Sequence, residues 1–215
     1  MNKTIKLLIF DLDGTLVDSH QDILNAVNRT LEHFNAPAVS ANEAKSFIGS
    51  GIFNFIIQRL LEKGIRDFER AAEVYRKNYA ECMLENTSVY ESVFEMLQSF
   101  SDYKKVVLTN KSNEFVGVIL EELELSNYFL NFYGKETFEK HKPDPLPIFK
   151  ISDEFNVSIE NILIIGDTEA DILAGKNASV RTVGVSYGYG DPSRLKEMQA
   201  DYIIDHPNEL ATILH

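Results

Sequence analysis

Two aspartates, Asp11 and Asp13, directly follow an apolar run in the segment KLLIFDLDGTLVDS, which begins at Lys6. Moving a carboxylate out of water is costly unless a cation or hydrogen-bond donors compensate for it. A carboxylate pair at the end of a buried strand therefore indicates either cation binding or chemistry. At such a site one carboxylate can attack phosphorus, while the other protonates the leaving oxygen and later deprotonates water.

Polar residues of complementary types lie further along the chain. Thr109 and Asn110 end the run VVLTN, Lys142 lies in HKPDP, and Asp167 and Asp171 lie in IIGDTEAD. A hydroxyl, an amide and an ammonium group can together bind an oxyanion. Clustered carboxylates attract a hard divalent cation such as Mg²⁺. The set predicts a phosphoryl-transfer site if the fold brings these segments together.

Short apolar runs rich in β-branched residues predict the strands of a sheet that would do so. Because these runs do not alternate polar and apolar residues, they are typical of parallel strands buried on both faces. Helical patterns lie between them, which favours a doubly wound parallel-sheet α/β fold. Ligands bind beyond the carboxyl ends of the strands in such folds, where the candidate residues would meet. The predicted strands are 5–10, 106–108, 162–165, 180–185 and 202–204.

The interval 18–87 departs from this alternation because it contains only helical patterns. Helices are predicted over 19–34, 52–63 and 67–85, and Ser40 with Glu43 forms the pattern of a capping box. About seventy residues suffice for a small domain. We therefore expect an α/β core made of residues 1–17 and 88–215, with a helical cap inserted after the first strand.

The composition narrows the choice of partners. The chain has 215 residues, of which 33 are Asp or Glu and 21 are Lys or Arg, giving a net charge of −12. An acidic surface repels nucleic acids and anionic membranes, so neither is an expected partner. The single cysteine, Cys82, cannot form an internal disulfide. These features, with no apolar run long enough for a membrane span, favour a cytoplasmic protein. The sequence leaves open whether it is a monomer or a homodimer.

The motifs DLDGTLVDS, VLTN, KPDP and GDTEAD, in this order, resemble those of the haloacid dehalogenase superfamily of phosphatases. This resemblance implies that Asp11 is the nucleophile and Asp13 the acid and base. It further implies that Thr109 binds phosphate and that Lys142 is the motif lysine. The inserted helices resemble the small cap of that superfamily.

The resemblance also implies a Mg²⁺ cofactor. Its ligands would be the Asp11 carboxylate, the Asp13 backbone carbonyl and Asp167, with Asp171 helping directly or through water. The superfamily includes dehalogenases, but Asp13 is the extra acid that phosphoryl transfer uses and dehalogenation does not. A phosphatase is therefore the expected activity.

Within the superfamily, the segments DGTLVDS, TNK, KPDP and GDTEADILAGKNA resemble phosphoglycolate phosphatases. So do FIGSGI, with Gly49 and Gly51, and the aromatic–glycine segment SYGYGDP. We predict that Gly14, Gly51 and Asn110 contact the substrate, a small phosphorylated metabolite. Gly49 and Gly51 could equally end a helix, and 187–190 could be a plain loop.

Three other functions are compatible with these motifs. The chain could be a phosphomutase, or a phosphatase of pyrophosphate or nucleotides, within the same superfamily. It could also be a receiver-like signalling module that is phosphorylated on aspartate, although the helical insertion argues against this. The rate at which an aspartyl phosphate turns over would separate a module from an enzyme.

Overall fold

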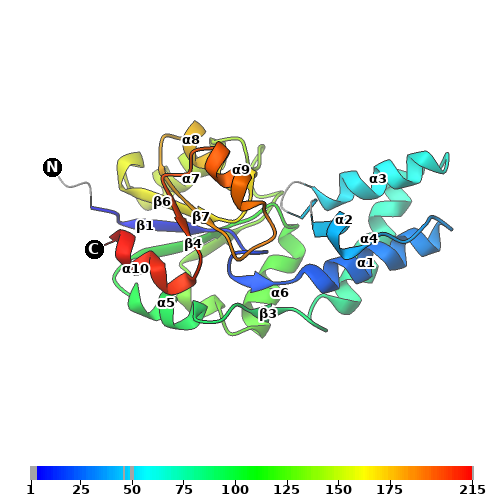
Figure 1. Ribbon diagram of the computed structural model, residues 1–215, viewed down its shortest axis with the longest axis horizontal. Coiled ribbons are helices and arrows are strands. Elements are labelled where there is room, and N and C mark those ends of the chain that lie inside the picture. Colours follow the sequence, from blue (N-terminus) through cyan, green and yellow to red (C-terminus); the bar gives the residue numbers. More distant parts are fainter. Residues whose placement is uncertain (1–3, 46, 49–50, 215) are drawn as a thin grey trace.

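A parallel six-stranded sheet forms the centre of the protein, as seen in the computed structural model, which describes residues 4–45, 47–48 and 51–214 (Figure 1). The sheet order is β5–β4–β1–β6–β7–β8. Its strands are β1 (Leu7–Phe10), β4 (Lys104–Leu108), β5 (Asn131–Tyr133), β6 (Ile162–Gly166), β7 (Arg181–Val185) and β8 (Tyr202–Ile204). The predicted fold class is confirmed, and each predicted strand overlaps an observed one.

The central strands are buried on both faces, as their apolar sequences predict. On one face Leu7 and Ile9 belong to an apolar cluster shared with α7 (Leu146–Phe155) and α8 (Glu169–Asn177). On the other face Leu8 and Phe10 belong to a cluster shared with α5 (Val93–Ser99), α6 (Asn113–Glu122) and α10 (Leu210–Leu214). Figure 1 shows these two helical layers above and below the sheet, with α9 (Pro192–Glu197) at the upper edge.

The position of β1 in the middle of the sheet sets the position of the candidate site. Phe10, its last residue, pairs with Val107 on β4 and with Ile165 on β6. The segments that follow these three strands therefore leave the same edge of the sheet next to one another. This places Asp11 between the residues that follow β4 and those that follow β6.

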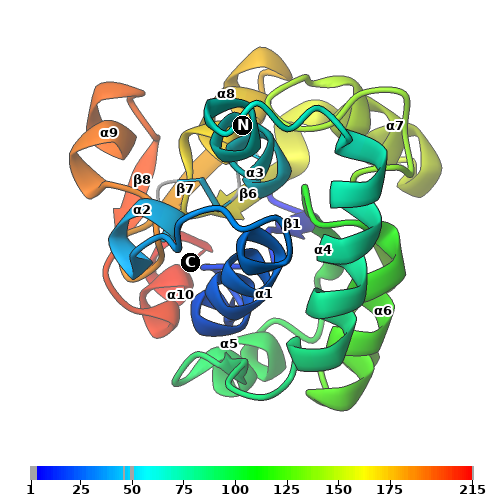
Figure 2. The same cartoon turned by 90° about the vertical axis from the view of Figure 1, so that its right-hand side faces the viewer.

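Four helices extend beyond this edge of the sheet. In chain order they come between β1 and the other strands of the sheet. They are α1 (His20–His33), α2 (Ala41–Lys45), α3 (Ile52–Glu62) and α4 (Phe68–Cys82). Figure 2 looks onto them and shows α1 beside α4. The chain leaves and re-enters the core through β2 (Val17–Asp18) and β3 (Ser88–Val89), which pair antiparallel at the predicted cap boundary. The division into two domains stays a prediction.

Local signals in this segment have the expected effects. Ser40 and Glu43 form the predicted capping box, since the Ser40 amide donates to the Glu43 carboxylate and the Glu43 amide donates to Ser40 Oγ. Cys82 is buried at the end of α4.

Several short elements were not predicted because they lack a long apolar run. The edge strand β5 has only three residues, one of them polar, and α5 has seven. Three turns of 3₁₀ helix, at Ser126–Tyr128, Ile159–Asn161 and Pro207–Glu209, complete the described elements.

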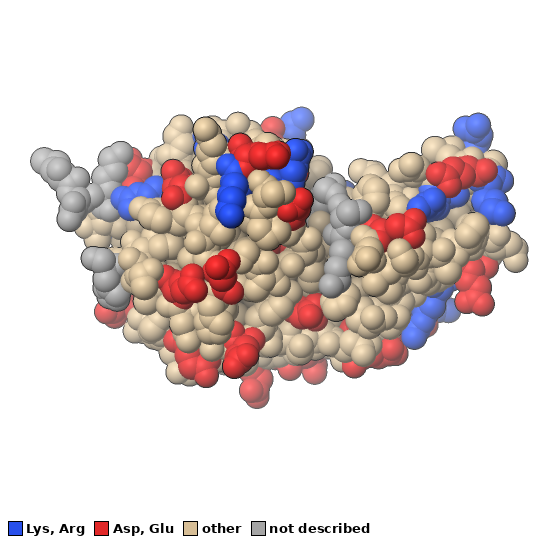
Figure 3. Space-filling model, in the orientation of Figure 1, with Lys and Arg blue, Asp and Glu red and all other residues tan. Residues whose placement is uncertain are grey.

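Acidic side chains are scattered over the face of the protein shown in Figure 3, in keeping with its negative net charge. In the described ranges, none of the helices combines the length and the apolar character needed to cross a membrane.

Candidate active site

Asp11 lies at the end of the central strand and is almost completely buried. Its Oδ1 atom lies 2.8 Å from Nζ of Lys142, but no donor within the described ranges is aligned for a hydrogen bond to it. Burial raises the pKa of Asp11 to about 6, although the Lys142 ammonium group opposes this rise. The carboxylate is therefore short of stabilising partners, which is the condition of a group that binds a cation or reacts.

Lys142 connects two of the predicted site carboxylates. Its Nζ lies 2.8 Å from Asp11 Oδ1 and 2.6 Å from Asp171 Oδ1, and the side chain is buried. Burial lowers the pKa of Lys142, but the two carboxylates outweigh this and raise it overall, so the ammonium group stays charged. The side-chain amide of Asn110 donates to the backbone carbonyl of Lys142 at 3.0 Å and so helps to hold this loop.

Asp171 has both carboxylate oxygens engaged. Oδ1 accepts from Lys142, while Oδ2 accepts from the Thr168 amide at 3.0 Å and from its hydroxyl at 2.7 Å. The bond from the Thr168 amide is one half of a capping box at the start of α8, in which the Asp171 amide donates in return to the Thr168 side chain; the sequence TEAD favours this arrangement. These contacts suit a residue that orients Lys142.

Asp167 follows β6 and is fully buried. Its Oδ2 atom accepts from the amides of Tyr189 at 2.7 Å and Gly190 at 3.3 Å. Burial raises its pKa well above the usual value, and the negative charges of Asp11 and Asp171 add to the rise.

Gly14 makes room for the Asp167 carboxylate. It has a φ of +84°, and a Cβ atom there would lie 2.3 Å from Asp167 Oδ2. A side chain at this position would therefore be strained and would also collide with the carboxylate. We predicted that Gly14 contacts substrate; the structure places it against Asp167, outside the set of described residues that line the adjoining cavity.

Asp13 has a partner that was not predicted. The Lys111 ammonium group donates to both of its oxygens, at 2.9 and 2.8 Å, and Ser19 Oγ donates to Oδ1 at 2.5 Å. Lys111 Nζ also lies 4.6 Å from the centre of the Tyr79 ring on α4. Lys111 thus joins the second aspartate to the helical segment.

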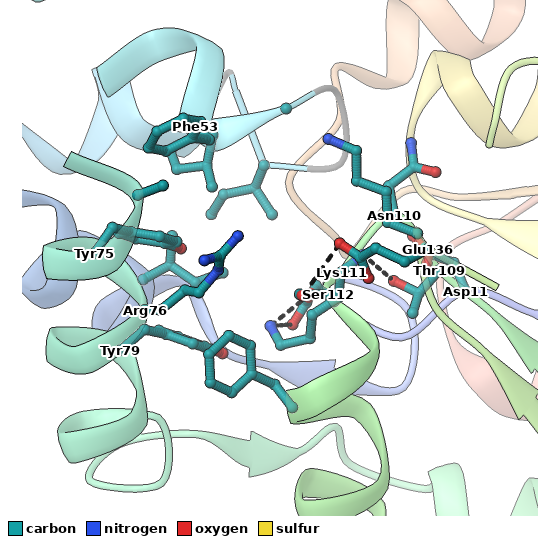
Figure 4. A pocket seen from close by; sticks show the side chains of 18 residues that line it. Asp11, Phe53, Tyr75, Arg76, Tyr79, Thr109, Asn110, Lys111, Ser112 and Glu136 are labelled. Atoms are coloured by element: carbon teal, nitrogen blue, oxygen red, sulfur yellow. Dashed lines mark hydrogen bonds and ion pairs between the residues drawn. The ribbon is translucent and has the colours of Figure 1, made fainter. Parts of the chain in front are cut away.

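A cavity of about 220 Å³ opens between the edge of the sheet and the helices (Figure 4). Volumes of about 300–1,000 Å³ are usual for ligand pockets, so this one suits a small ligand. Predicted residues that line it are Asp11, Asp13, Thr109, Asn110 and Gly51; the helices add Ile52, Phe53, Tyr75, Arg76 and Tyr79. Gly49, named with Gly51 above, lies outside the described residues.

Residues 8–185 match the model of a family described as "Haloacid dehalogenase-like hydrolase". The chain belongs to this family. It is 34% identical to a phosphoglycolate phosphatase of Aquifex aeolicus, over 98% of this chain and 97% of that protein. A phosphoglycolate phosphatase of Colwellia psychrerythraea is 33% identical, over 95% of each chain. The family predicted from the four motifs is thereby confirmed.

The fold of this haloacid dehalogenase-like hydrolase recurs in a solved structure. The crystal structure of a predicted phosphoglycolate phosphatase from Haemophilus somnus superimposes with a TM-score of 0.92 at 27% identity, covering 98% of both chains.

Charge balance in the site tests whether a divalent cation fits this hydrolase. Asp11, Asp167 and Asp171 each offer an oxygen within 4.8 Å of the others. Lys142 pairs with Asp11 and Asp171, and Lys111 pairs with Asp13, so with Asp167 these four carboxylates have only two ammonium groups as ion-pair partners. Hard oxygen donors with this charge deficit fit Mg²⁺. Asp11 and Asp167 would be the better ligands, since Asp171 is already bound to the Lys142 ammonium group at 2.6 Å, whereas Asp167 accepts from a hydroxyl and two amides.

The uncompensated charge leads to a prediction for the metal-free protein. We expect Asp167→Asn to raise its melting temperature, because burial and the charges of Asp11 and Asp171 disfavour ionisation of Asp167 in the folded protein but not in the unfolded chain, and an amide carries no such penalty. A gain of about 1 kcal/mol would shift the melting temperature by roughly 2–4 °C for a chain of this size. Calorimetry in the presence of a chelator measures the shift, with the exposed Asp102→Asn as the matched control.

The burial of Asp11 gives the metal-free protein a pH dependence of known sign. Since the pKa of Asp11 rises from 3.8 in the unfolded chain to about 6, the folded state takes up this proton more readily. The resulting stabilisation is present below pH 3.8 and is lost as the pH rises through about 6. A melting temperature for Asp167→Asn below that of the unmodified protein at pH 7.5 would contradict this account of the site.

Proposed function

We propose that this hydrolase is a Mg²⁺-dependent phosphatase that cleaves the phosphate ester of a small metabolite such as phosphoglycolate. The observation that carries the proposal is the position of Asp11, a buried carboxylate at the floor of a small cavity, beside a second carboxylate and a buried ammonium group. The names of the relatives support the choice of phosphoglycolate.

In the first step, an Asp11 oxygen forms a bond to phosphorus while the ester bond breaks. Asp13 gives its proton to the departing oxygen. In the second step, Asp13 takes a proton from water as the water oxygen attacks the aspartyl phosphate, which releases inorganic phosphate and restores Asp11. Lys142 keeps positive charge beside Asp11, and Thr109 would hold the phosphoryl group.

Asp11, Asp167 and the Asp13 carbonyl would hold a Mg²⁺ ion, and Asp171 would help directly or through water. The ion would stabilise negative charge on the phosphoryl oxygens. We expect activity to vanish in the presence of a chelator and to return when Mg²⁺ is added. Ca²⁺ should bind without supporting turnover, because it takes more ligands than Mg²⁺ and holds them in a less strict geometry. Phosphate release from p-nitrophenyl phosphate after exhaustive chelation measures this dependence, and unchanged activity would rule out the metal.

The substrate preference is tested with a panel of phosphorylated metabolites, ranked by kcat/KM in the presence of Mg²⁺. The small volume of the cavity favours a small leaving group over a nucleotide. Gly51, at the start of α3 on the cavity wall, and Asn110 opposite would contact that group. A nucleotide or pyrophosphate as the best substrate, or transfer of phosphate to a second sugar hydroxyl, would replace this assignment.

A further inference from the structure

Lys111 carries a buried positive charge that has no role in the mechanism proposed above. Its side chain is only 6% exposed, and its ammonium group donates to both oxygens of Asp13. An ammonium group has three N–H donors, so one remains after these two bonds. Because burying a charge is costly, a lysine on the wall of a cavity is a candidate to bind an anion there.

Tyr79 offers a second polar group on the same wall. The centre of its ring lies 4.6 Å from Lys111 Nζ, and Figure 4 shows the two side chains pointing toward each other, Tyr79 from α4 and Lys111 from the core. The tyrosine is 1% exposed, and its hydroxyl has no hydrogen-bond partner among the residues that the structure describes. Leaving a buried hydroxyl unpaired costs free energy, because the group loses its hydrogen bonds to water. A ligand that accepts from this hydroxyl would remove the cost.

The chemistry of the leaving group places an anion near these two donors. If Asp13 protonates the ester oxygen, that oxygen lies beside the carboxylate to which Lys111 is bonded. In an O-phosphorylated 2-hydroxy acid, the carboxylate begins two bonds from the ester oxygen. We infer that Lys111 and the Tyr79 hydroxyl together bind the carboxylate of the leaving group and so select 2-phospho-hydroxy acids. This inference rests on the proposed function.

Two other cations line the cavity among the described residues. One is Lys135, which is exposed, and the other is Arg76. Its side chain is 58% exposed, and Nε lies 3.5 Å from a carboxylate oxygen of Glu114 on α6. A charge in water contributes little to discrimination, because solvent screens it and competes for its donors. Lys111, which is buried and next to Asp13, is the best placed of the three.

The test compares two substrates that differ only in the carboxylate. Ethyl phosphate has a methyl group where 2-phosphoglycolate has its carboxylate. We expect Lys111→Met to lower the preference for 2-phosphoglycolate, measured as the ratio of the two kcat/KM values, by about 10- to 100-fold, because a charged hydrogen bond is lost. Tyr79→Phe, which keeps the ring beside Lys111, should lower it by about 3- to 10-fold.

Using the ratio separates recognition from catalysis. Lys111→Met also removes a partner of Asp13, which slows both substrates and cancels in the ratio. The exposed Lys150→Met on α7 and Tyr202→Phe on β8 are matched controls that should change neither kcat/KM value. Equal losses for the two substrates in Lys111→Met, or a lost preference in Arg76→Leu instead, would overturn the inference.

Binding distinguishes failure of this inference from failure of the proposed function. Dissociation constants for 2-phosphoglycolate and ethyl phosphate are measured by calorimetry on the Asp11→Asn variant and on its combination with Lys111→Met. Absence of turnover of any phosphate ester by the unmodified enzyme would refute the proposed function. Equal affinities for the two ligands, or a difference in affinity that survives loss of Lys111, would refute the subsite.

Discussion

Asp11→Asn should reduce phosphate release by on the order of 10⁶-fold, the size of loss seen when a hydrolase loses its covalent nucleophile. An amide oxygen is a poor nucleophile, and the amide cannot form the aspartyl phosphate. The protein should still fold, because the substitution removes a charge that burial already disfavours, as the raised pKa of Asp11 indicates. The loss would therefore be chemical rather than structural.

The measurement is steady-state phosphate release at saturating substrate and Mg²⁺, together with circular dichroism of the same sample. Asp102→Asn, an exposed residue, receives the same substitution and should keep full activity. Substantial turnover by Asp11→Asn would end the covalent mechanism. In that case a directly attacking water would have to replace Asp11, with Asp13 as its base.

The positions of the site carboxylates could be predicted from the sequence because the carboxyl ends of parallel strands lie at the same edge of a sheet. Once β1 is recognised as a buried strand, Asp11 must lie at its carboxyl end, and Asp167 after β6 must lie beside it. The same reasoning brings Thr109 next to Asp11 through β4. Each placement depends on one apolar run and on the common direction of the strands.

The partners of Asp13 could not be found in this way. Lys111 is 98 positions away from Asp13 in the sequence. Its ion pair with Asp13 depends on the rotamers of side chains that follow β4. The segment TNK was recognised as a motif, but nothing in the letters assigns its lysine to a carboxylate rather than to solvent. Tyr79 reaches Lys111 from α4, so this contact depends on how the helices lie over the sheet.

The contacts of the loop 187–190 could not be predicted from the sequence either. The sequence allowed it to be either a plain loop or part of the site, and the structure brings the amides of Tyr189 and Gly190 to Asp167. The Tyr189 hydroxyl also accepts from the amides of Ser19 and His20, at 2.6 and 3.1 Å. One tyrosine thus contacts both a site carboxylate and the start of α1. The contact with Asp167 spans 22 positions and the contact with Ser19 spans 170, both beyond the reach of local patterns.

Asp13→Asn is expected to slow turnover by about 10²- to 10⁴-fold, the usual range for loss of a general acid–base group. The effect is smaller than for Asp11→Asn because the nucleophile remains. Both steps should suffer, since the amide can neither protonate the departing oxygen nor take a proton from water. An activated ester such as p-nitrophenyl phosphate, whose leaving oxygen needs no proton, should lose little rate in the first step and much in the second.

This difference between the steps makes an intermediate visible. With p-nitrophenyl phosphate, Asp13→Asn should release one burst of nitrophenol and then stall as an aspartyl phosphate on Asp11, detectable by mass spectrometry of the acid-quenched protein. The double variant Asp11→Asn/Asp13→Asn is the control and should show neither the burst nor the added mass. Steady turnover without a burst, at the rate of the unmodified enzyme, would show that Asp13 handles no proton and that its ion pair with Lys111 serves the structure alone.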